Sequence, residues 1–189
     1  MIGTRWVHTD KREVANEVKI DATLPLLAKA RIVVQGCQER IDIETYSPTA
    51  SLLCFHLVCA VASMKRFKLG AADAECAYLQ GDGINRQLIL RSPTPPPPGV
   101  VAGQLFRARA SIYGTKDAGR GWWKKLFRVL TEMGWRCSVL ENCLFYLYDE
   151  QSQLRGILAT HVDDLFVAGD HSTSFFPENF QEIAETIKL

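Results

Sequence analysis

The chain has 189 residues, of which 47% are hydrophobic and 23% are charged, a composition that excludes a mainly disordered or fibrous protein. The longest apolar run, residues 52–64, is shorter than the roughly 20 residues that a membrane-spanning helix needs, and the charged N-terminal residues do not fit a secretory signal. We therefore expect an intracellular protein, cytoplasmic or nuclear, that has no membrane partner and forms one domain or a core with a lobe.

The net charge of +1 hides an uneven distribution along the chain. Residues 107–128 contain seven basic residues and one acidic residue, whereas residues 140–189 contain nine acidic residues and two basic ones. A basic face and an acidic region on one small body suit a phosphate-bearing ligand together with a metal centre. Two solvated surfaces of opposite sign explain the same pattern.

The six cysteines include no Cys-x-x-Cys pair, and no histidine stands at a metal-binding spacing from them. Most of them lie beside apolar residues. We interpret the cysteines as reduced and mostly buried, because a zinc site built from this sequence would need ligands at closer, paired spacing.

In the first half of the chain the pattern predicts short strands and one helix. Residues 2–20 alternate weakly, which predicts exposed strands or a hairpin, and residues 29–35 are rich in β-branched residues that favour a strand. Ser47 followed by Pro48 is a typical helix start, and the apolar residues after it predict a helix to about Arg66 that is buried on several sides. The segments that complete this half are strand 67–74, turn region 77–83, strand 87–91 and the proline-rich surface loop 93–99.

The second half begins with a strongly amphipathic segment. Residues 117–133 predict a helix with Trp122 on its apolar face and Gly134 as its terminator. Its opposite stripe consists of Arg120, Lys124 and Arg128, which are spaced by four and share one exposed face. The remaining predicted elements are strands 145–148, 156–160 and 165–168 and a helix over 178–189.

Acidic residues interrupt apolar, strand-like runs at two places, where a carboxylate is costly unless it is paired or bound to metal. Asp73 lies near the end of its strand, and Asp163 and Asp164 lie at a tight turn between two others. If these strands are neighbours, three carboxylates converge at one sheet edge, where divalent cations relieve their repulsion. Two Mg²⁺ ions about 4 Å apart would suit polymerase or nuclease chemistry, and an ordinary polar turn is the alternative.

Seven motifs stand in an order that is more specific than any one of them. In this order, and at approximately the family's spacing, the motifs make the sequence resemble the reverse transcriptase domain of copia-type retrotransposons over nearly the whole chain. The motifs are Gly3-Thr-Arg-Trp-Val7, Lys29-Ala-Arg-Ile-Val33, Glu44-Thr-Tyr-Ser-Pro48, Asp73-x-x-x-Ala-Tyr-Leu-x-Gly81, Tyr113-Gly-x-Lys116, Arg120-x-Trp122 and Val162-Asp-Asp164.

The resemblance implies an α+β polymerase right hand in which an antiparallel palm sheet packs on helices. The fingers would comprise about residues 1–47 and 87–112, and the palm about residues 48–86 and 113–189. The thumb would be absent, because the chain ends soon after the predicted Asp-Asp hairpin. The implied partners are an RNA or DNA template with its primer, deoxynucleoside triphosphates and the remaining polyprotein segments, namely thumb, RNase H and integrase.

The resemblance also implies roles for individual residues. Asp73, Asp163 and Asp164 match the catalytic acids that bind two Mg²⁺ ions, with Mn²⁺ as a substitute. Tyr78 matches an aromatic residue beneath the sugar that rejects a ribose 2′-hydroxyl. The other matched positions are Lys29, Arg31 and Lys116 for the incoming nucleotide and Arg120, Lys124, Arg128 and His161 for template and primer.

Simpler interpretations stand beside these roles. Tyr78 also fits a half-buried aromatic with a polar handle, and Lys29 and Arg31 also fit a strand edge kept soluble by charge. The basic stripe fits a solvated helix face equally well.

The sequence also departs from the family pattern. His161 replaces an aromatic residue, and Ser51, His56, Asp117 and Gly119 replace other usual residues. An inactive, truncated relic that only binds nucleic acid is therefore a second hypothesis. A two-metal nuclease is a third, but it does not explain the ordered motifs.

Overall fold

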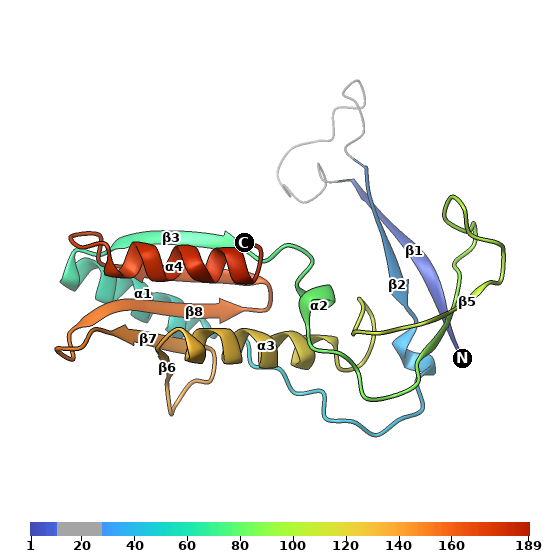
Figure 1. Cartoon of the computed structure of the whole chain (residues 1–189), viewed down its shortest axis with the longest axis horizontal. Coiled ribbons are helices and arrows are strands. Elements are labelled where there is room, and N and C mark those ends of the chain that lie inside the picture. The colour runs from blue at the N-terminus through green and yellow to red at the C-terminus, as the bar shows by residue number, and fades with distance from the viewer. Residues whose placement is uncertain (11–27) are drawn as a thin grey trace. The chain divides into compact units, whose positions relative to one another are not determined.

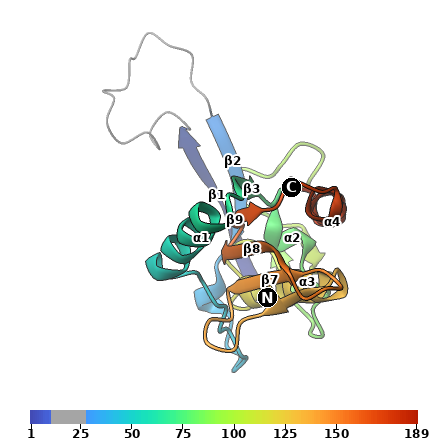
Figure 2. The same cartoon turned by 90° about the vertical axis from the view of Figure 1, so that its left-hand side faces the viewer.

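The computed structural model describes residues 1–10 and 28–189. The chain forms two compact units (Figures 1 and 2): the first unit comprises Met1–Ile43 and Gly83–Lys116, and the second comprises Glu44–Asp82 and Asp117–Leu189. The fold is mixed α+β, with one sheet in each unit, as the sequence predicts. Part of the predicted strand region 2–20 lies outside the described residues.

The first unit contains a four-stranded sheet of order β2-β1-β4-β5. Its strands are β1 (Ile2–Asp10), β2 (Ala28–Val34), β4 (Ile89–Arg91) and β5 (Leu105–Arg107), with a 3₁₀ turn at Gly36–Gln38. Strands β1 and β2 form a long antiparallel pair, whereas β1 and β4 run parallel. A small core of Ile2, Val34, Leu88 and Leu90 lies against this sheet. The predicted strands at 29–35 and 87–91 are confirmed, and β5 was not predicted.

The second unit contains a five-stranded antiparallel sheet of order β3-β9-β8-β7-β6. The strands are β3 (Lys68–Asp73), β6 (Trp135–Cys137), β7 (Leu144–Tyr148), β8 (Leu154–His161) and β9 (Asp164–Gly169). Four of these five strands were predicted, and β6 was not. The last four form a meander along the chain, and β3, made much earlier, pairs with β9 at its edge.

Helices cover both faces of this sheet (Figure 2): α1 (Leu52–Lys65) lies on one face, and α3 (Ala118–Glu132) and α4 (Phe175–Thr186) lie on the other. A short helix, α2 (Ala77–Gln80), follows β3. Side chains alternate between the faces along each strand. On β8, Leu158 therefore joins the core under α3 and α4, whereas Ile157 and Ala159 join the core under α1.

Helix α1 differs from its prediction in two ways. It begins at Leu52 after the cap residue Ser51, not at Ser47-Pro48, and the Ser47 hydroxyl instead donates to the Gly119 carbonyl oxygen at 3.1 Å. The expectation of burial on several sides is wrong, because α1 packs on the sheet through one stripe. That stripe consists of Cys54, Val58 and Ala62. The exposed large apolar residues of α1 are Leu52, Leu53, Leu57 and Met64.

The cysteines also differ from the expectation. All six are free thiols, but only Cys54 and Cys143 are buried. Cys37, Cys59 and Cys76 are exposed and Cys137 is half-buried, so the expectation that most are buried is wrong. Apolar neighbours in the sequence did not imply burial, because an element buries only one of its faces.

Helix α4 docks on the sheet where two glycines face each other. Gly156 of β8 lies directly opposite Gly169 of β9, and the buried ring of Phe176 covers both. A Cβ atom at Gly156 would lie 2.9 Å from the ring, and one at Gly169 would overlap it.

Among the helices of the described residues, none has both the length and the apolar character of a membrane-spanning segment.

Candidate active site

The sheet of the second unit brings two of the predicted acids into direct opposition. In the pairing of β3 with β9, Asp73 lies opposite Asp164, and in the pairing of β8 with β9, Asp164 lies opposite His161. Residues directly opposite each other project from the same face of a sheet. Asp73, Asp164 and His161 therefore share one face at one end of the sheet, and all three are exposed.

Asp163 lies in the turn between β8 and β9, next to the end of β3. Its carbonyl oxygen accepts a hydrogen bond of 2.9 Å from the backbone N–H of Ala74, the residue after Asp73. The backbones of all three predicted acids thus meet at one sheet edge. Their carboxylates do not converge as expected. Among the described residues, the carboxylate oxygens of Asp73, Asp163 and Asp164 do not all lie within 4.8 Å of one another.

The turn itself is held by a buried tryptophan. The Trp122 indole N–H, on α3, donates a 2.7 Å hydrogen bond to the carbonyl oxygen of Val162, and Trp122 is only 1% exposed. This confirms the prediction that Trp122 belongs to the core. Its role in holding the turn was missed, although the motif Arg120-x-Trp122 marked the position.

A second contact fixes the strand that enters the turn. The backbone N–H of Ala50 donates to the Thr160 carbonyl oxygen at 2.9 Å. On the next residue, the His161 Nδ1 atom lies 3.3 Å from the Ala50 carbonyl oxygen. The segment just before α1 is therefore tied to the end of β8 beside the aspartates.

Tyr78, on α2, is half-buried and lies close enough to Asp163 to sense its charge. Burial, followed by the negative charge of Asp163, raises the pKa of the Tyr78 hydroxyl above its ordinary value of 10.0. The hydroxyl therefore stays protonated at neutral pH. The side chain offers a ring and a neutral O–H at the same end of the sheet as the aspartates.

The basic stripe on α3 is partly engaged within the protein. Arg120 forms an ion pair with Glu44 and donates to the Tyr46 carbonyl oxygen at 3.0 Å, and its side chain is 17% exposed. Arg128 makes a bidentate pair with Asp82 at 2.8 and 3.1 Å. Lys124 is exposed. The expectation that all three line one exposed face is thus wrong for Arg120, whose guanidinium is half-buried against the segment before α1.

The three predicted nucleotide-binding cations belong to the first unit. Lys29 is exposed on β2, and two residues on, the Arg31 guanidinium lies over the Tyr113 ring, 5.6 Å from its centre. The exposed Lys116 donates to the Ile41 carbonyl oxygen at 3.4 Å. Lys29 and Arg31 share one face of their strand because residues two apart project to the same side.

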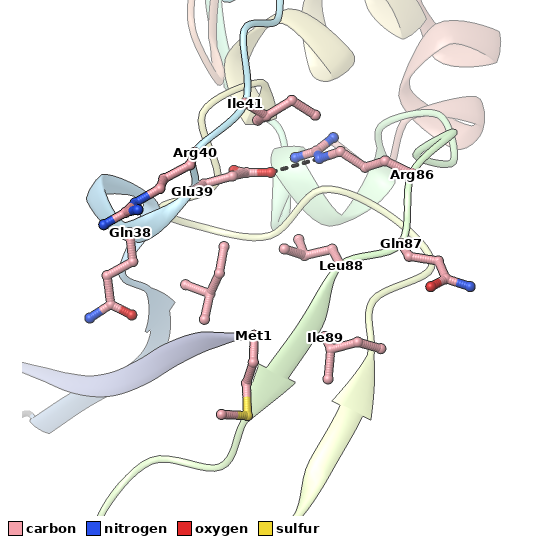
Figure 3. Close-up of a pocket in the computed structure, with 10 residues that line it drawn as sticks. Met1, Gln38, Glu39, Arg40, Ile41, Arg86, Gln87, Leu88 and Ile89 are labelled. Carbon is pink, nitrogen blue, oxygen red and sulfur yellow. Dashed lines mark hydrogen bonds and ion pairs between the residues drawn. The ribbon is translucent and has the colours of Figure 1, made fainter.

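A pocket of about 380 Å³ lies elsewhere in the first unit (Figure 3). Glu39 and Arg86 face each other across it with an ion pair of 2.7 Å, and none of the predicted site residues lines it. The second carboxylate oxygen of Glu39 is buried without a hydrogen-bond partner among the described residues. The pocket therefore holds an ion pair of the first unit and does not extend the acidic site.

Comparison with known proteins links the sequence of this chain to one family. A family model described as reverse transcriptase (RNA-dependent DNA polymerase) matches residues 1–189. The chain is 28% identical over 177 residues, 90% of its length, to the "Retrovirus-related Pol polyprotein from transposon RE2" of Arabidopsis thaliana. It is 24% identical over 148 residues, 75% of its length, to the "Retrovirus-related Pol polyprotein from transposon TNT 1-94" of Nicotiana tabacum. In each case the match spans 11% of the relative's length.

Proposed function

Because this chain belongs to the reverse transcriptase (RNA-dependent DNA polymerase) family, of the copia type, we propose that it is the polymerase part of a retrotransposon polyprotein. It would extend a primer on an RNA or DNA template, using deoxynucleoside triphosphates. The observation that carries the proposal is the register of the sheet, which places Asp73 opposite Asp164 with Asp163 in the adjoining turn.

The donor set at this sheet edge fits divalent cations. Asp73, Asp163 and Asp164 supply only carboxylate oxygens, the ligands that Mg²⁺ prefers and Mn²⁺ accepts. Facing like charges repel each other, so Asp73 and Asp164 would gain from a cation between them. When bound, two Mg²⁺ ions would activate the primer hydroxyl and stabilise the leaving phosphate oxygen.

The neighbouring residues would position the reactants. Tyr78 would lie beneath the sugar of the incoming nucleotide, where its ring leaves no room for a ribose 2′-hydroxyl. His161, on the same sheet face as the paired aspartates, would contact the primer end. Trp122 would keep the turn in place by holding the Val162 carbonyl oxygen.

The two units would correspond to the fingers and the palm. The division at residues 43/44, 82/83 and 116/117 supports this, because each boundary lies near a boundary expected from the resemblance. Lys29 and Arg31 would then bind the triphosphate from the fingers, through charge and the guanidinium fork of Arg31. Lys116, which the resemblance assigns to the palm, belongs to the first unit and would act with them. Arg120, Lys124 and Arg128 would contact template or primer phosphates.

Primer extension tests the proposal. The purified chain, and the same chain continued beyond Leu189, would be given a primed RNA template, Mg²⁺ and deoxynucleoside triphosphates. We expect incorporation that disappears in Asp164→Asn and in Asp73→Asn. The matched control is Glu75→Gln, which removes an exposed carboxylate two residues after Asp73 and should leave incorporation unchanged.

Three outcomes would contradict the proposal. Full incorporation by Asp73→Asn would remove the aspartates from the mechanism. Salt-dependent binding of the primed template without incorporation by either chain would favour the inactive relic. Strand cleavage without incorporation would favour a nuclease.

A further inference from the structure

A second cluster of ligand atoms lies in the second unit, on the side of the sheet covered by α1. The Sγ atoms of Cys54 and Cys143 and a carboxylate oxygen of Glu141 all lie within 4.8 Å of one another, and among the described residues no other such group of three occurs. Cys54 comes from the first turn of α1, whereas Glu141 and Cys143 come from the segment before β7. The sequence spacing argued against such a site because it could not show that α1 and β7 meet.

The backbone holds these side chains firmly. The Cys143 carbonyl oxygen accepts a 2.8 Å hydrogen bond from the Thr160 N–H of β8, and the Leu144 N–H donates to the Glu141 carbonyl oxygen at 3.0 Å. The Cys143 thiol faces the Glu141 carboxylate at 3.8 Å. On the helix side, the Cys54 sulfur lies 3.5 Å from the Ser51 hydroxyl oxygen.

Burial makes this cluster unusual. Cys54 and Cys143 are 2% and 1% exposed, and Glu141 is half-buried at its rim. Burial first, then the neighbouring Cys54 and the charge of Glu141, raise the pKa of the Cys143 thiol to about 12. A cation that binds the cluster would have to displace the thiol protons.

We propose that Cys54, Cys143 and Glu141 bind one thiophilic divalent cation of the zinc class. Two thiolates and a carboxylate suit tetrahedral zinc, with water or the Ser51 hydroxyl in the fourth position. They do not suit Mg²⁺, which takes oxygen ligands, so this site is chemically distinct from the aspartate edge. The first turn of a helix also favours negative charge such as a thiolate at Cys54.

The cation would stabilise the part of the fold that supports the aspartates. It would join the start of α1 to the start of β7. Ala50, four residues before Cys54, bonds to Thr160 and His161 at the end of β8. The cation would therefore anchor residues 50–54. This segment is bonded to the end of β8, where the chain enters the turn that contains Asp163.

Metal titration of the purified full chain in reducing buffer tests this inference. We expect one Zn²⁺ per chain to remain after dialysis, and one equivalent of Co²⁺ or Cd²⁺ to produce thiolate-to-metal charge-transfer absorption. Cys54→Ser and Cys143→Ser should abolish this absorption, and Glu141→Gln should weaken affinity at least about tenfold. Affinity should fall as the pH is lowered, because protons compete for the ligands.

Matched controls separate this site from nonspecific thiol binding. Cys59→Ser removes an exposed thiol from the same helix and should leave stoichiometry and absorption unchanged. Circular dichroism would show whether the buried-cysteine variants fold. If they do not, Glu141→Gln decides, since its half-buried side chain lies in a loop.

The inference fails if the unaltered chain shows no saturable one-to-one binding. It also fails if folded Cys54→Ser and Cys143→Ser bind as the unaltered chain does, or if Cys59→Ser loses binding to the same extent. A Cys54–Cys143 disulfide under non-reducing conditions, with no metal uptake in reducing buffer, would assign the pair to thiol oxidation instead.

Discussion

Among single residues, Val162 has a strained backbone conformation at the proposed active site. Its φ is 59°, in the left-handed region where a β-branched residue is a rare exception. Such a conformation costs about 1–3 kcal/mol and persists only where the surroundings enforce it. Here the hydrogen bond from Trp122 and the pairing of His161 with Asp164 enforce it.

Val162→Gly should therefore raise the free energy of unfolding. Relief of the left-handed strain outweighs the added freedom of glycine in the unfolded chain, giving a net gain of about 0.5–2 kcal/mol. Urea denaturation followed by circular dichroism measures this. Primer extension should fall at the same time, because the glycine turn holds Asp163 less firmly. A lower midpoint in urea would show that the valine side chain stabilises the turn.

If the proposed function is correct, the size of the Tyr78 side chain sets the selectivity for the sugar of the nucleotide. Tyr78→Val should raise ribonucleotide incorporation relative to deoxyribonucleotide incorporation at least about tenfold, since the smaller side chain admits a 2′-hydroxyl. Single-nucleotide extension with each nucleotide measures the ratio. The control Tyr46→Val alters an exposed tyrosine and should not change it. An unchanged ratio in Tyr78→Val would assign Tyr78 a packing role.

At the scale of the element, α4 and the strand ends β8 and β9 form one tightly fitted group. Phe176 is 3% exposed and its ring fills the space over Gly156 and Gly169. Close-packed interiors tolerate added atoms poorly. Arg155, beside Gly156 on β8, forms ion pairs with Asp149 at the end of β7, at 2.7 Å, and with Asp170 at the end of β9, at 2.5 Å.

Gly169→Ala should lower the free energy of unfolding by about 1–3 kcal/mol, because the new methyl group overlaps the Phe176 ring and displaces α4. Urea denaturation measures the change. Gly70→Ala is the matched control: it also lies in a strand of this sheet, and its Cβ would meet only Val167, at an ordinary 3.5 Å. If both substitutions lowered the free energy of unfolding equally, the replacement of a strand glycine would be the cause of the loss, and not the contact with the Phe176 ring.

The Arg155 ion pairs predict how stability depends on pH. Hydrogen bonds from Ser172, followed by Arg155, lower the pKa of Asp170 below its ordinary 3.8. At Asp149 burial opposes ionisation, but hydrogen bonds from the Gln153 N–H and from Arg155 outweigh it and lower the pKa as well. Because the folded values lie below the unfolded ones, this stabilisation is complete above the ordinary carboxyl pKa and is lost as the pH falls below it.

Arg155→Gln should therefore be less stable than the unaltered chain at pH 7, and the difference should shrink as the pH falls to about 3. Urea midpoints at both pH values measure it. Lys65→Gln, an exposed residue of α1, should show no such difference. A difference that stays constant with pH would mean that Arg155 acts through packing alone.

At the scale of the whole molecule, local patterns predicted most elements but not how they meet. Helix α3 and strands β7, β8 and β9 carry clear periodicity, and each was predicted within a few residues. Strands β5 and β6 have three residues each, too few for alternation to show. The parallel pairing of β1 with β4 and the meeting of Cys54 with Cys143 depend on tertiary packing, which spacing in the sequence does not reveal.

The strand pairing beneath the candidate site was predictable for a different reason, whereas the expected convergence of the three carboxylates is not found within 4.8 Å among the described residues. The opposition of Asp73 and Asp164 followed from placing both acids at the ends of strands assumed to be neighbours, and the register confirms that placement. The engagement of Arg120 by Glu44 was not predictable, because a stripe spaced by four shows which residues share a face but not what packs against it.

Binding of the primed template would depend on charge spread over the surface of the molecule. Lys124→Gln should weaken binding and reduce the steepness of its salt dependence by roughly 0.9 in a log–log plot, the loss of one phosphate contact. Fluorescence anisotropy over a range of salt concentrations measures it. Lys65→Gln should leave the slope unchanged, and an unchanged slope in Lys124→Gln would leave the basic stripe of α3 as a solvated helix face.

The pairing of β3 with β9 has a consequence for synthesis on the ribosome. Every described residue of the first unit has been translated by Lys116, whereas the second unit still lacks β6, β7, β8 and β9 at that point. Until Gly169 leaves the exit tunnel, β3 has no partner strand, and an unpaired strand edge invites association with other nascent chains.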